Sequence, residues 1–179
     1  IEKLKHFVSK DAFNIEGLGK KIVENFWNLN LIKLPQDIFN LDFKKIENLE
    51  GWGTQSMENL KYSINQRKNI SLERLIYSLG IRHIGLENAK ILSKYFKSFS
   101  NFINFSNELN SDDILNIDGI GETQLKSVKN FFDNKVNLNI LKELKKILEV
   151  KNVVTEDKNG LLNEKTFMVT GKLNGISRA

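Results

Sequence analysis

Four short segments of the sequence share a pattern that can bind phosphate groups through the backbone. Each has an apolar residue, a polar residue, a glycine or turn-forming residue, a second apolar residue and a final glycine. Such a segment predicts a tight turn with a residue at positive φ and a buried central apolar side chain. The turn leaves N–H groups facing outward beside the positive end of the next helix, where they can hold phosphate. We number these hairpins one to four: Ile15-Glu16-Gly17-Leu18-Gly19, Leu49-Glu50-Gly51-Trp52-Gly53, Ile81-Arg82-His83-Ile84-Gly85 and Ile117-Asp118-Gly119-Ile120-Gly121.

The spacing of the hairpins indicates an internal repeat. Their final glycines, at positions 19, 53, 85 and 121, are separated by 34, 32 and 36 residues. Each interval has room for about two helices and their connections. One Gly-x-Gly between helices is more often a plain turn or helix cap, but four at near-constant spacing favour nucleic-acid binding. Because peptide N–H groups read no base, the expected ligand is the sugar-phosphate backbone of any sequence.

Side chains next to hairpins one and two add candidate phosphate contacts. Lys20 and Lys21 begin the helix after hairpin one, and they either reach phosphate or form a solvated face. Thr54 and Gln55 follow hairpin two and can donate hydrogen bonds to phosphate, and Thr54 can also cap the helix. We interpret Trp52, the central apolar residue of hairpin two, as a core side chain rather than a base-stacking platform.

Hairpin three departs from the glycine pattern of the other hairpins, and hairpin four is followed by two candidate contacts. His83 replaces the first glycine of hairpin three, and we interpret it as a turn residue because histidine tolerates left-handed backbone angles. Arg82 either approaches a phosphate or the minor groove, or forms a surface ion pair. Thr123 and Lys126 are the predicted contacts after hairpin four. The complete predicted DNA-binding set is Gly17, Gly19, Lys20, Lys21, Gly51, Gly53, Thr54, Gln55, Arg82, His83, Gly85, Gly119, Gly121, Thr123 and Lys126.

The sequence predicts no catalytic residue, no metal site and no cofactor site in this chain. Cysteine is absent and His6 and His83 are the only histidines, which excludes thiolate sites and disfavours a histidine-built metal centre. Carboxylates recur before the glycines of three hairpins, as Glu16, Glu50 and Asp118. We interpret them as organisers of the turns or as caps rather than as metal ligands.

Helices are predicted to position the hairpins. Apolar residues recur at intervals of three and four, as in Ile22, Val23, Phe26 and Trp27, and strand-like alternation is missing before residue 150. With 40% hydrophobic and 27% charged residues, the composition is that of a folded globular domain. The predicted fold is therefore one compact all-α domain of four helix-hairpin-helix units over residues 1–149.

The pattern changes after residue 149. Residues 150–163 are polar and contain Asn-Gly, which is typical of a linker. Residues 166–170 then form a short β-prone run that ends at Gly171. We therefore predict that residues 164–179 are the truncated start of a second domain.

Two longer runs carry a resemblance to a known family. They are residues 6–19, HFVSKDAFNIEGLG, and residues 75–85, LIYSLGIRHIG. Together with the four hairpins, they closely resemble the helix-hairpin-helix domain of bacterial NAD-dependent DNA ligases, over residues 1 to about 150. The tail, KTFMVTGKL at residues 165–173 with Ser177-Arg178, resembles the start of the BRCT domain that follows in the same enzymes.

This resemblance implies binding of nicked double-stranded DNA from its minor-groove side, within an enzyme that seals nicks in replication and repair. It also implies that NAD, Mg and a structural Zn are bound elsewhere in the parent protein. The adenylation, oligonucleotide-binding and zinc-finger domains of that polypeptide are then the partners of this chain. No Lys-x-Asp-Gly sequence of the adenylated-lysine kind occurs here, so we expect the chain alone to be unable to seal nicks. We also expect it to be a monomer.

Charge and hydropathy allow a DNA-binding role without requiring it. The net charge of +5 and the pI near 9.3 permit an anionic partner. No apolar run approaches about 18 residues, and the first residues lack the pattern of a signal peptide. We therefore expect a cytoplasmic, nucleoid-associated protein with no membrane partner.

Three alternatives remain open from the sequence. The chain can be a stand-alone helix-hairpin-helix protein that binds junctions or damaged DNA, although the BRCT-like tail argues against this. It can also be a helical protein-protein adaptor, which would be indifferent to lysine-to-glutamate changes at Lys20 and Lys126 in a DNA-binding assay. Finally, it can be an active ligase, which would seal nicked DNA with NAD.

Overall fold

The protein is mostly helical in the computed structural model, which describes residues 1–105 and 117–154. Hairpins one to four immediately precede α2, α4, α6 and α9. The elements in chain order are α1 (Glu2–Phe7), α2 (Lys20–Asn28), η1 (Pro35–Asn40), α3 (Phe43–Glu47), α4 (Thr54–Gln66), β1 (Asn69–Ser71), α5 (Leu72–Ser78), α6 (Leu86–Phe96), α7 (Phe99–Asn104), α9 (Glu122–Asp133), α10 (Lys135–Ile147) and β2 (Glu149–Lys151).

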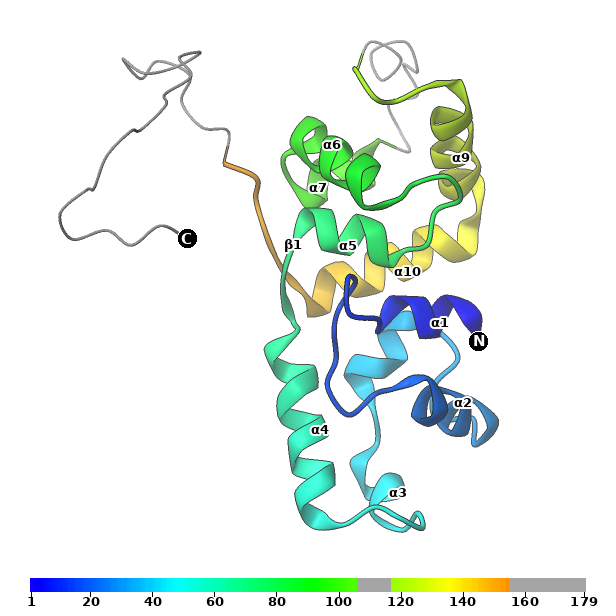
Figure 1. Cartoon of the computed structure of the whole chain (residues 1–179), viewed down its shortest axis with the longest axis vertical. Coiled ribbons are helices and arrows are strands. Elements are labelled where there is room, and N and C mark those ends of the chain that lie inside the picture. The colour runs from blue at the N-terminus through cyan, green and yellow to red at the C-terminus, as the bar shows by residue number, and fades with distance from the viewer. Residues whose placement is uncertain (106–116, 155–179) are drawn as a thin grey trace, which may run out of the picture.

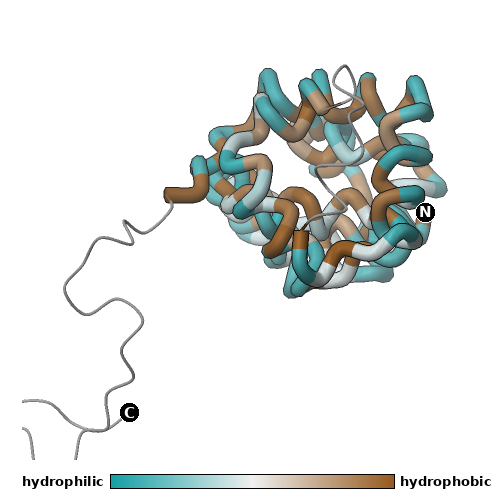
Figure 2. The backbone as a smooth tube through the Cα atoms, turned by 90° about the horizontal axis from the view of Figure 1, so that it is seen from above, coloured by the Kyte–Doolittle hydropathy of each residue, from teal (hydrophilic) through white to brown (hydrophobic). Residues whose placement is uncertain are grey.

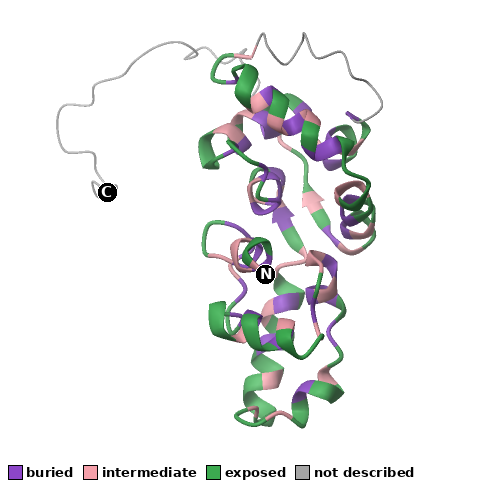
Figure 3. Cartoon of the chain, turned by 90° about the vertical axis from the view of Figure 1, so that its right-hand side faces the viewer, coloured by how far each residue is buried: buried purple, intermediate pink, exposed green. Residues whose placement is uncertain are grey.

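The molecule is elongated, and three helices occupy its middle. Helices α1, α5 and α10 lie there, with α2, α3 and α4 toward one end and α6, α7 and α9 toward the other (Figure 1). Apolar and polar stretches alternate along the chain, and most helices carry buried residues on one side and exposed residues on the other (Figures 2 and 3). Such amphipathic helices gain most of their stability from packing their apolar faces together.

The buried core contains two groups of phenylalanines. In the half with hairpins one and two, the rings of Phe7 and Phe13 stack with their centroids 4.3 Å apart. In the other half the rings meet edge to face, as for Phe102 and Phe132 at 5.1 Å. These arrangements suit the quadrupole of an aromatic ring, so each cluster fixes the mutual orientation of its helices.

A small sheet corrects two of the sequence predictions. Strands β1 and β2 pair in parallel, with Ile70 opposite Val150, so the body is not purely α-helical. Val150 packs against the core and the N–H of Val153 donates to the Lys97 carbonyl oxygen at 2.8 Å, so the packed body extends past its predicted end at residue 149 into the predicted linker. Each strand has only three residues, too few to reveal an alternation in the sequence. The remaining linker from residue 155 and the predicted BRCT start lie outside the described residues.

Two arginines hold the loop that connects α1 with hairpin one. Arg74 of α5 donates from Nε to the Ala12 carbonyl oxygen at 2.8 Å and from Nη2 to the Lys10 carbonyl oxygen at 2.6 Å. Arg67, directly after α4, donates from Nε to the Asn14 carbonyl oxygen at 3.0 Å. The entry to hairpin one is therefore fixed by side chains that lie more than fifty residues further along the chain.

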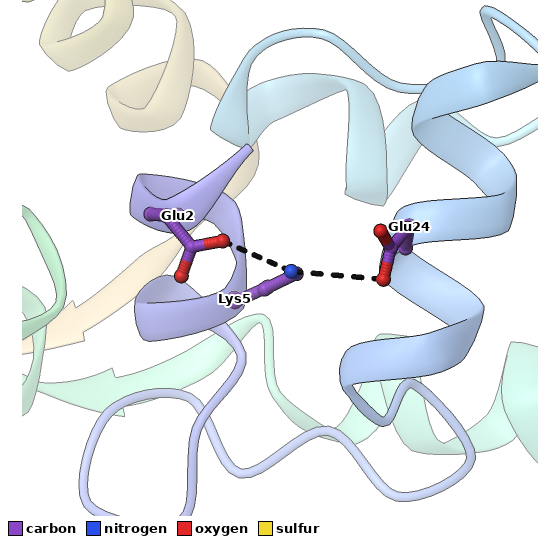
Figure 4. A network of polar contacts seen from close by, with 3 residues as sticks. All are labelled: Glu2, Lys5 and Glu24. Atoms are coloured by element: carbon purple, nitrogen blue, oxygen red, sulfur yellow. Dashed lines mark hydrogen bonds and ion pairs between the residues drawn. The ribbon is translucent and has the colours of Figure 1, made fainter.

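An ion-pair network joins α1 to α2. Lys5 Nζ lies 2.9 Å from Glu2 Oε1 and 3.7 Å from Glu24 Oε2 (Figure 4). The hydrogen bond from Lys5, reinforced by its charge, lowers the pKa of Glu2. The same hydrogen bond raises the pKa of Lys5.

Within residues 1–105 and 117–154, no helix combines the length and the apolar character that crossing a bilayer requires.

Candidate nucleic-acid interface

All four hairpins adopt the same backbone turn. The N–H of the fourth residue donates to the carbonyl oxygen of the first, at 3.2 Å in hairpins one and two, 3.1 Å in hairpin three and 3.0 Å in hairpin four. The third residue has positive φ: 82° at Gly17, 83° at Gly51, 62° at His83 and 88° at Gly119. This is the geometry of a type II turn, in which the third position favours glycine. His83 therefore occupies the turn position predicted for it.

The final glycine of each hairpin is the N-cap of the following helix. Gly19, Gly53, Gly85 and Gly121 all have extended backbone angles, and no side chain caps any of these four helices. The alternative interpretation of Thr54 as a helix cap is therefore wrong, because Thr54 is already the first helical residue. A glycine cap has no side-chain acceptor, so it leaves the first N–H groups of the helix without an intrahelical partner.

The consequence is a set of unpaired N–H groups at every hairpin. In each hairpin, the backbone N–H groups of the second, third and fifth residues donate no hydrogen bond within the described residues. The same holds for the first three residues of the helix that follows. These second, third and fifth hairpin residues are exposed in all four cases. Each hairpin thus presents free amide donors at the positive end of a helix dipole, which is an arrangement suited to an anion.

The central apolar residues anchor the turns from below. Leu18, Ile84 and Ile120 are 1%, 5% and 4% exposed. Trp52 is half-buried and packs against the core, with its ring 5.5 Å from that of Phe26. The hairpin backbone therefore projects outward because its apolar side chain is held inward.

The predicted basic contacts are exposed and form no ion pair within the described residues. Lys20, Lys21, Arg82 and Lys126 are all exposed, and none forms an ion pair with a described carboxylate. The structure therefore gives no ion-pair partner to Arg82 within the described part of the chain.

Two of the predicted polar contacts, Gln55 and Thr123, differ in whether their side chains already form a hydrogen bond within the described residues. The Gln55 amide donates from Nε2 to Asn59 Oδ1 at 3.0 Å. The side chain of Thr123 is exposed, and its carbonyl oxygen accepts a hydrogen bond from Ser127 Oγ at 2.9 Å. Thr123 is thus the freer of the two to donate to a ligand.

The hairpins are arranged in two pairs. A Cβ atom on Gly17 would lie 3.6 Å from Cδ1 of Leu60 in α4, so hairpin one packs on the helix that follows hairpin two. A Cβ atom on Gly119 would lie 2.7 Å from Cδ1 of Ile91 in α6, so hairpin four packs on the helix that follows hairpin three. Hairpins one and two lie toward one end of the molecule and hairpins three and four toward the other (Figure 1).

The sequence did not point to the polar groove between hairpins one and two. This groove has a volume of about 900 Å³, and its walls include Asn25 of α2 and Asn59, Tyr62 and Gln66 of α4. Exposed polar residues on a helix face are common, so only the packing of hairpin one against α4 distinguishes these from other solvated residues.

The chain matches a known motif family and a set of known enzymes. The family described as "helix-hairpin-helix motif" matches residues 74–141, which include hairpins three and four. The chain is 64% identical to the DNA ligase of Pelagibacter ubique over 179 residues, which is 100% of this chain and 26% of that protein. The chain is homologous, over its whole length, to part of a DNA ligase.

Other relatives give the same similarity. The chain is 44% identical to the DNA ligase of Wolbachia pipientis wMel and 42% identical to that of Rickettsia bellii strain RML369-C, each match covering 99% of this chain and 28% of the relative. The chain thus spans about a quarter of the length of these relatives. The predicted resemblance to DNA ligases is confirmed, whereas NAD dependence and the BRCT start stay predictions.

Proposed function

We propose that this chain is the DNA-binding, non-catalytic part of an NAD-dependent DNA ligase. It binds the sugar-phosphate backbone of nicked double-stranded DNA from the minor-groove side, through four helix-hairpin-helix units. NAD, Mg and a structural Zn are held by other domains of the whole ligase. The observation that carries the proposal is the recurrence of free, exposed amide donors at all four hairpins.

The physical basis of binding is charge neutralisation without base reading. Peptide N–H groups at helix N-termini donate hydrogen bonds to phosphate oxygens in DNA of any sequence, and the exposed lysines beside them add positive charge. Lys20 and Lys21 lie in the first turn of α2, after hairpin one, and Lys126 lies in the second turn of α9, after hairpin four. The proposed module supplies affinity and alignment of the DNA ends, whereas the chemistry of sealing belongs to the rest of the enzyme.

Gel-shift titrations of a nicked duplex at several salt concentrations test this function. If the hairpins neutralise roughly four to eight phosphates, log affinity falls with log salt at a slope of roughly −4 to −7. Lys20→Glu and Lys126→Glu weaken binding, whereas Lys145→Glu in the last turn of α10 leaves it unchanged. A slope near zero, or equal binding by all three variants, contradicts the proposal and favours a protein-protein adaptor.

A sealing assay with the same chain, NAD and nicked DNA separates the module from the complete enzyme. We expect no sealed product, because the proposal places the adenylated lysine and the NAD site in other domains of the whole ligase. Sealing by the chain alone would contradict the non-catalytic assignment.

A further inference from the structure

The groove between hairpins one and two has a wall of neutral hydrogen-bonding side chains. Ser56, Asn59, Ser63 and Gln66 of α4 all line it. Their spacing of three, four and three residues places them along one face of that helix. The groove is open and holds about 900 Å³ between the tips of the two hairpins.

This groove is chemically unlike the hairpins that border it. Among the described residues that line it, none is a lysine and the one arginine, Arg67, already donates from Nε to the Asn14 carbonyl oxygen. Glu16 and Glu50 add negative charge at its edge. A phosphate group is therefore not the ligand that the groove favours, although both neighbouring hairpins offer free amides to phosphate.

The amide of Asn59 is oriented as a hydrogen-bond donor. Gln55 Nε2 donates to Asn59 Oδ1 at 3.0 Å, which occupies the acceptor side of the Asn59 amide. Asn59 Nδ2 donates no hydrogen bond within the described residues. Asn59 is exposed and lines the groove, so its two N–H groups are available to a ligand that carries acceptors.

The minor-groove edges of base pairs carry such acceptors. Every base pair presents adenine or guanine N3 or a pyrimidine O2 there, and an amide donor bonds these groups in nearly any sequence. If hairpins one and two hold the two phosphate backbones, the surface between them faces the edges that separate those backbones.

We propose that the groove between hairpins one and two contacts the minor-groove base edges of the bound duplex, with Asn59 as the donor. This inference rests on the proposed DNA binding and adds a second kind of contact to it. Hairpin amides and lysines bind the charged backbone, and Asn59 bonds the uncharged edges. Removing Asn59 should therefore lower affinity without changing the number of phosphates neutralised.

The test compares two asparagines of α4 on two duplexes. Asn59→Ala lowers the affinity for a nicked duplex about three- to tenfold with an unchanged salt slope. Asn65→Ala is the matched control, because Asn65 is exposed on the same helix and does not line the groove. The second duplex carries 3-deazaadenine, which replaces the N3 acceptor with a C–H group and leaves the phosphates intact.

The wild-type chain should bind the 3-deazaadenine duplex about three- to tenfold more weakly than the ordinary duplex, and Asn59→Ala should bind both equally. Asn59→Asp should bind more weakly than Asn59→Ala, because it places an acceptor against an acceptor. Thermal melts of each variant verify folding. If Asn59→Ala binds like Asn65→Ala, or still discriminates between the duplexes, this inference fails while the proposed function stands. If the wild-type chain binds neither duplex, the proposed function itself fails.

Discussion

His83 occupies a backbone position that the other three hairpins fill with glycine. Its φ of 62° is in the left-handed region, which costs a side-chain-bearing residue about 1–2 kcal/mol. The Asn88 amide donates from Nδ2 to the His83 carbonyl oxygen at 3.0 Å and stabilises the turn. His83→Gly relieves the backbone strain but makes the unfolded chain more flexible, and the two effects oppose each other. We expect the free energy of unfolding in urea to change by less than about 1 kcal/mol; a larger loss would mean that the imidazole itself stabilises the hairpin.

Gly119, at the equivalent position of hairpin four, tolerates substitution less well. Its φ is 88°, and an added Cβ would lie 2.7 Å from Ile91 Cδ1. Backbone strain at positive φ therefore dominates in Gly119→Ala, because Ile91 Cδ1 is the end of a side chain and can shift, and we expect urea denaturation to show a loss of about 1–3 kcal/mol. Gly85→Ala is the control, because Gly85 has φ of −82° and no atom lies within 4 Å of its added Cβ. Equal losses in both variants would contradict this account of the turn.

Among the contacts between elements, Arg74 joins α5 to the loop that enters hairpin one. Arg74→Ala leaves the carbonyl groups of Lys10 and Ala12 without their charged donor. We expect the free energy of unfolding in urea to fall by about 1.5–3 kcal/mol. Arg82→Ala is the matched control, since Arg82 is exposed and makes no ion pair within the described residues, and it should leave stability unchanged. Equal stability of the two variants would show that the loop is held by its apolar residues instead.

The ion pair between Glu2 and Lys5, which lies within α1, should make stability depend on pH. Lys5 lowers the pKa of Glu2 below 4.5, so this contact contributes above pH 4.5 and is lost as pH falls through the lowered value. The pKa of Lys5 is raised above 10.5, so its contribution is present below pH 10.5 and is lost as pH rises through the raised value. Glu2→Gln should therefore have a lower urea midpoint than the wild type at pH 7 and the same midpoint in strong acid. Glu47→Gln, at an exposed carboxylate outside the described ion pairs, should match the wild type at both pH values.

The elements differ in how much of them the sequence could predict. Helices and turns were predictable because apolar spacing and glycine report local backbone geometry directly. Strands β1 and β2 were not, since three residues whose partner lies eighty residues away carry no local period. The same reason hid Arg74, which donates to the distant residues Lys10 and Ala12, and the groove that Asn59 lines, which segments far apart in the sequence form together. The free amides at the hairpins followed from local rules, whereas the groove required the packing of hairpin one on α4.

At the scale of the whole molecule, the two hairpin pairs form opposite parts of one packed body. Helix α10 packs against η1 in the half with hairpins one and two and against α7 and α9 in the other half. The two pairs are thereby joined by a shared helix rather than by a free connection. If one pair binds a duplex as proposed, the other pair meets that duplex in a fixed orientation, which favours simultaneous contact by both pairs.

Simultaneous contact predicts additive salt dependence. Lys20 lies after hairpin one and Lys126 after hairpin four, in different pairs. If both pairs bind the same duplex at once, Lys20→Glu and Lys126→Glu should each reduce the salt slope by about 1, and the double variant should reduce it by about 2. If the pairs instead bind alternately, each single variant keeps binding through the intact pair, and only the double variant loses affinity strongly. Titrations of the four proteins on one nicked duplex distinguish the two outcomes, because only simultaneous binding gives equal and additive steps.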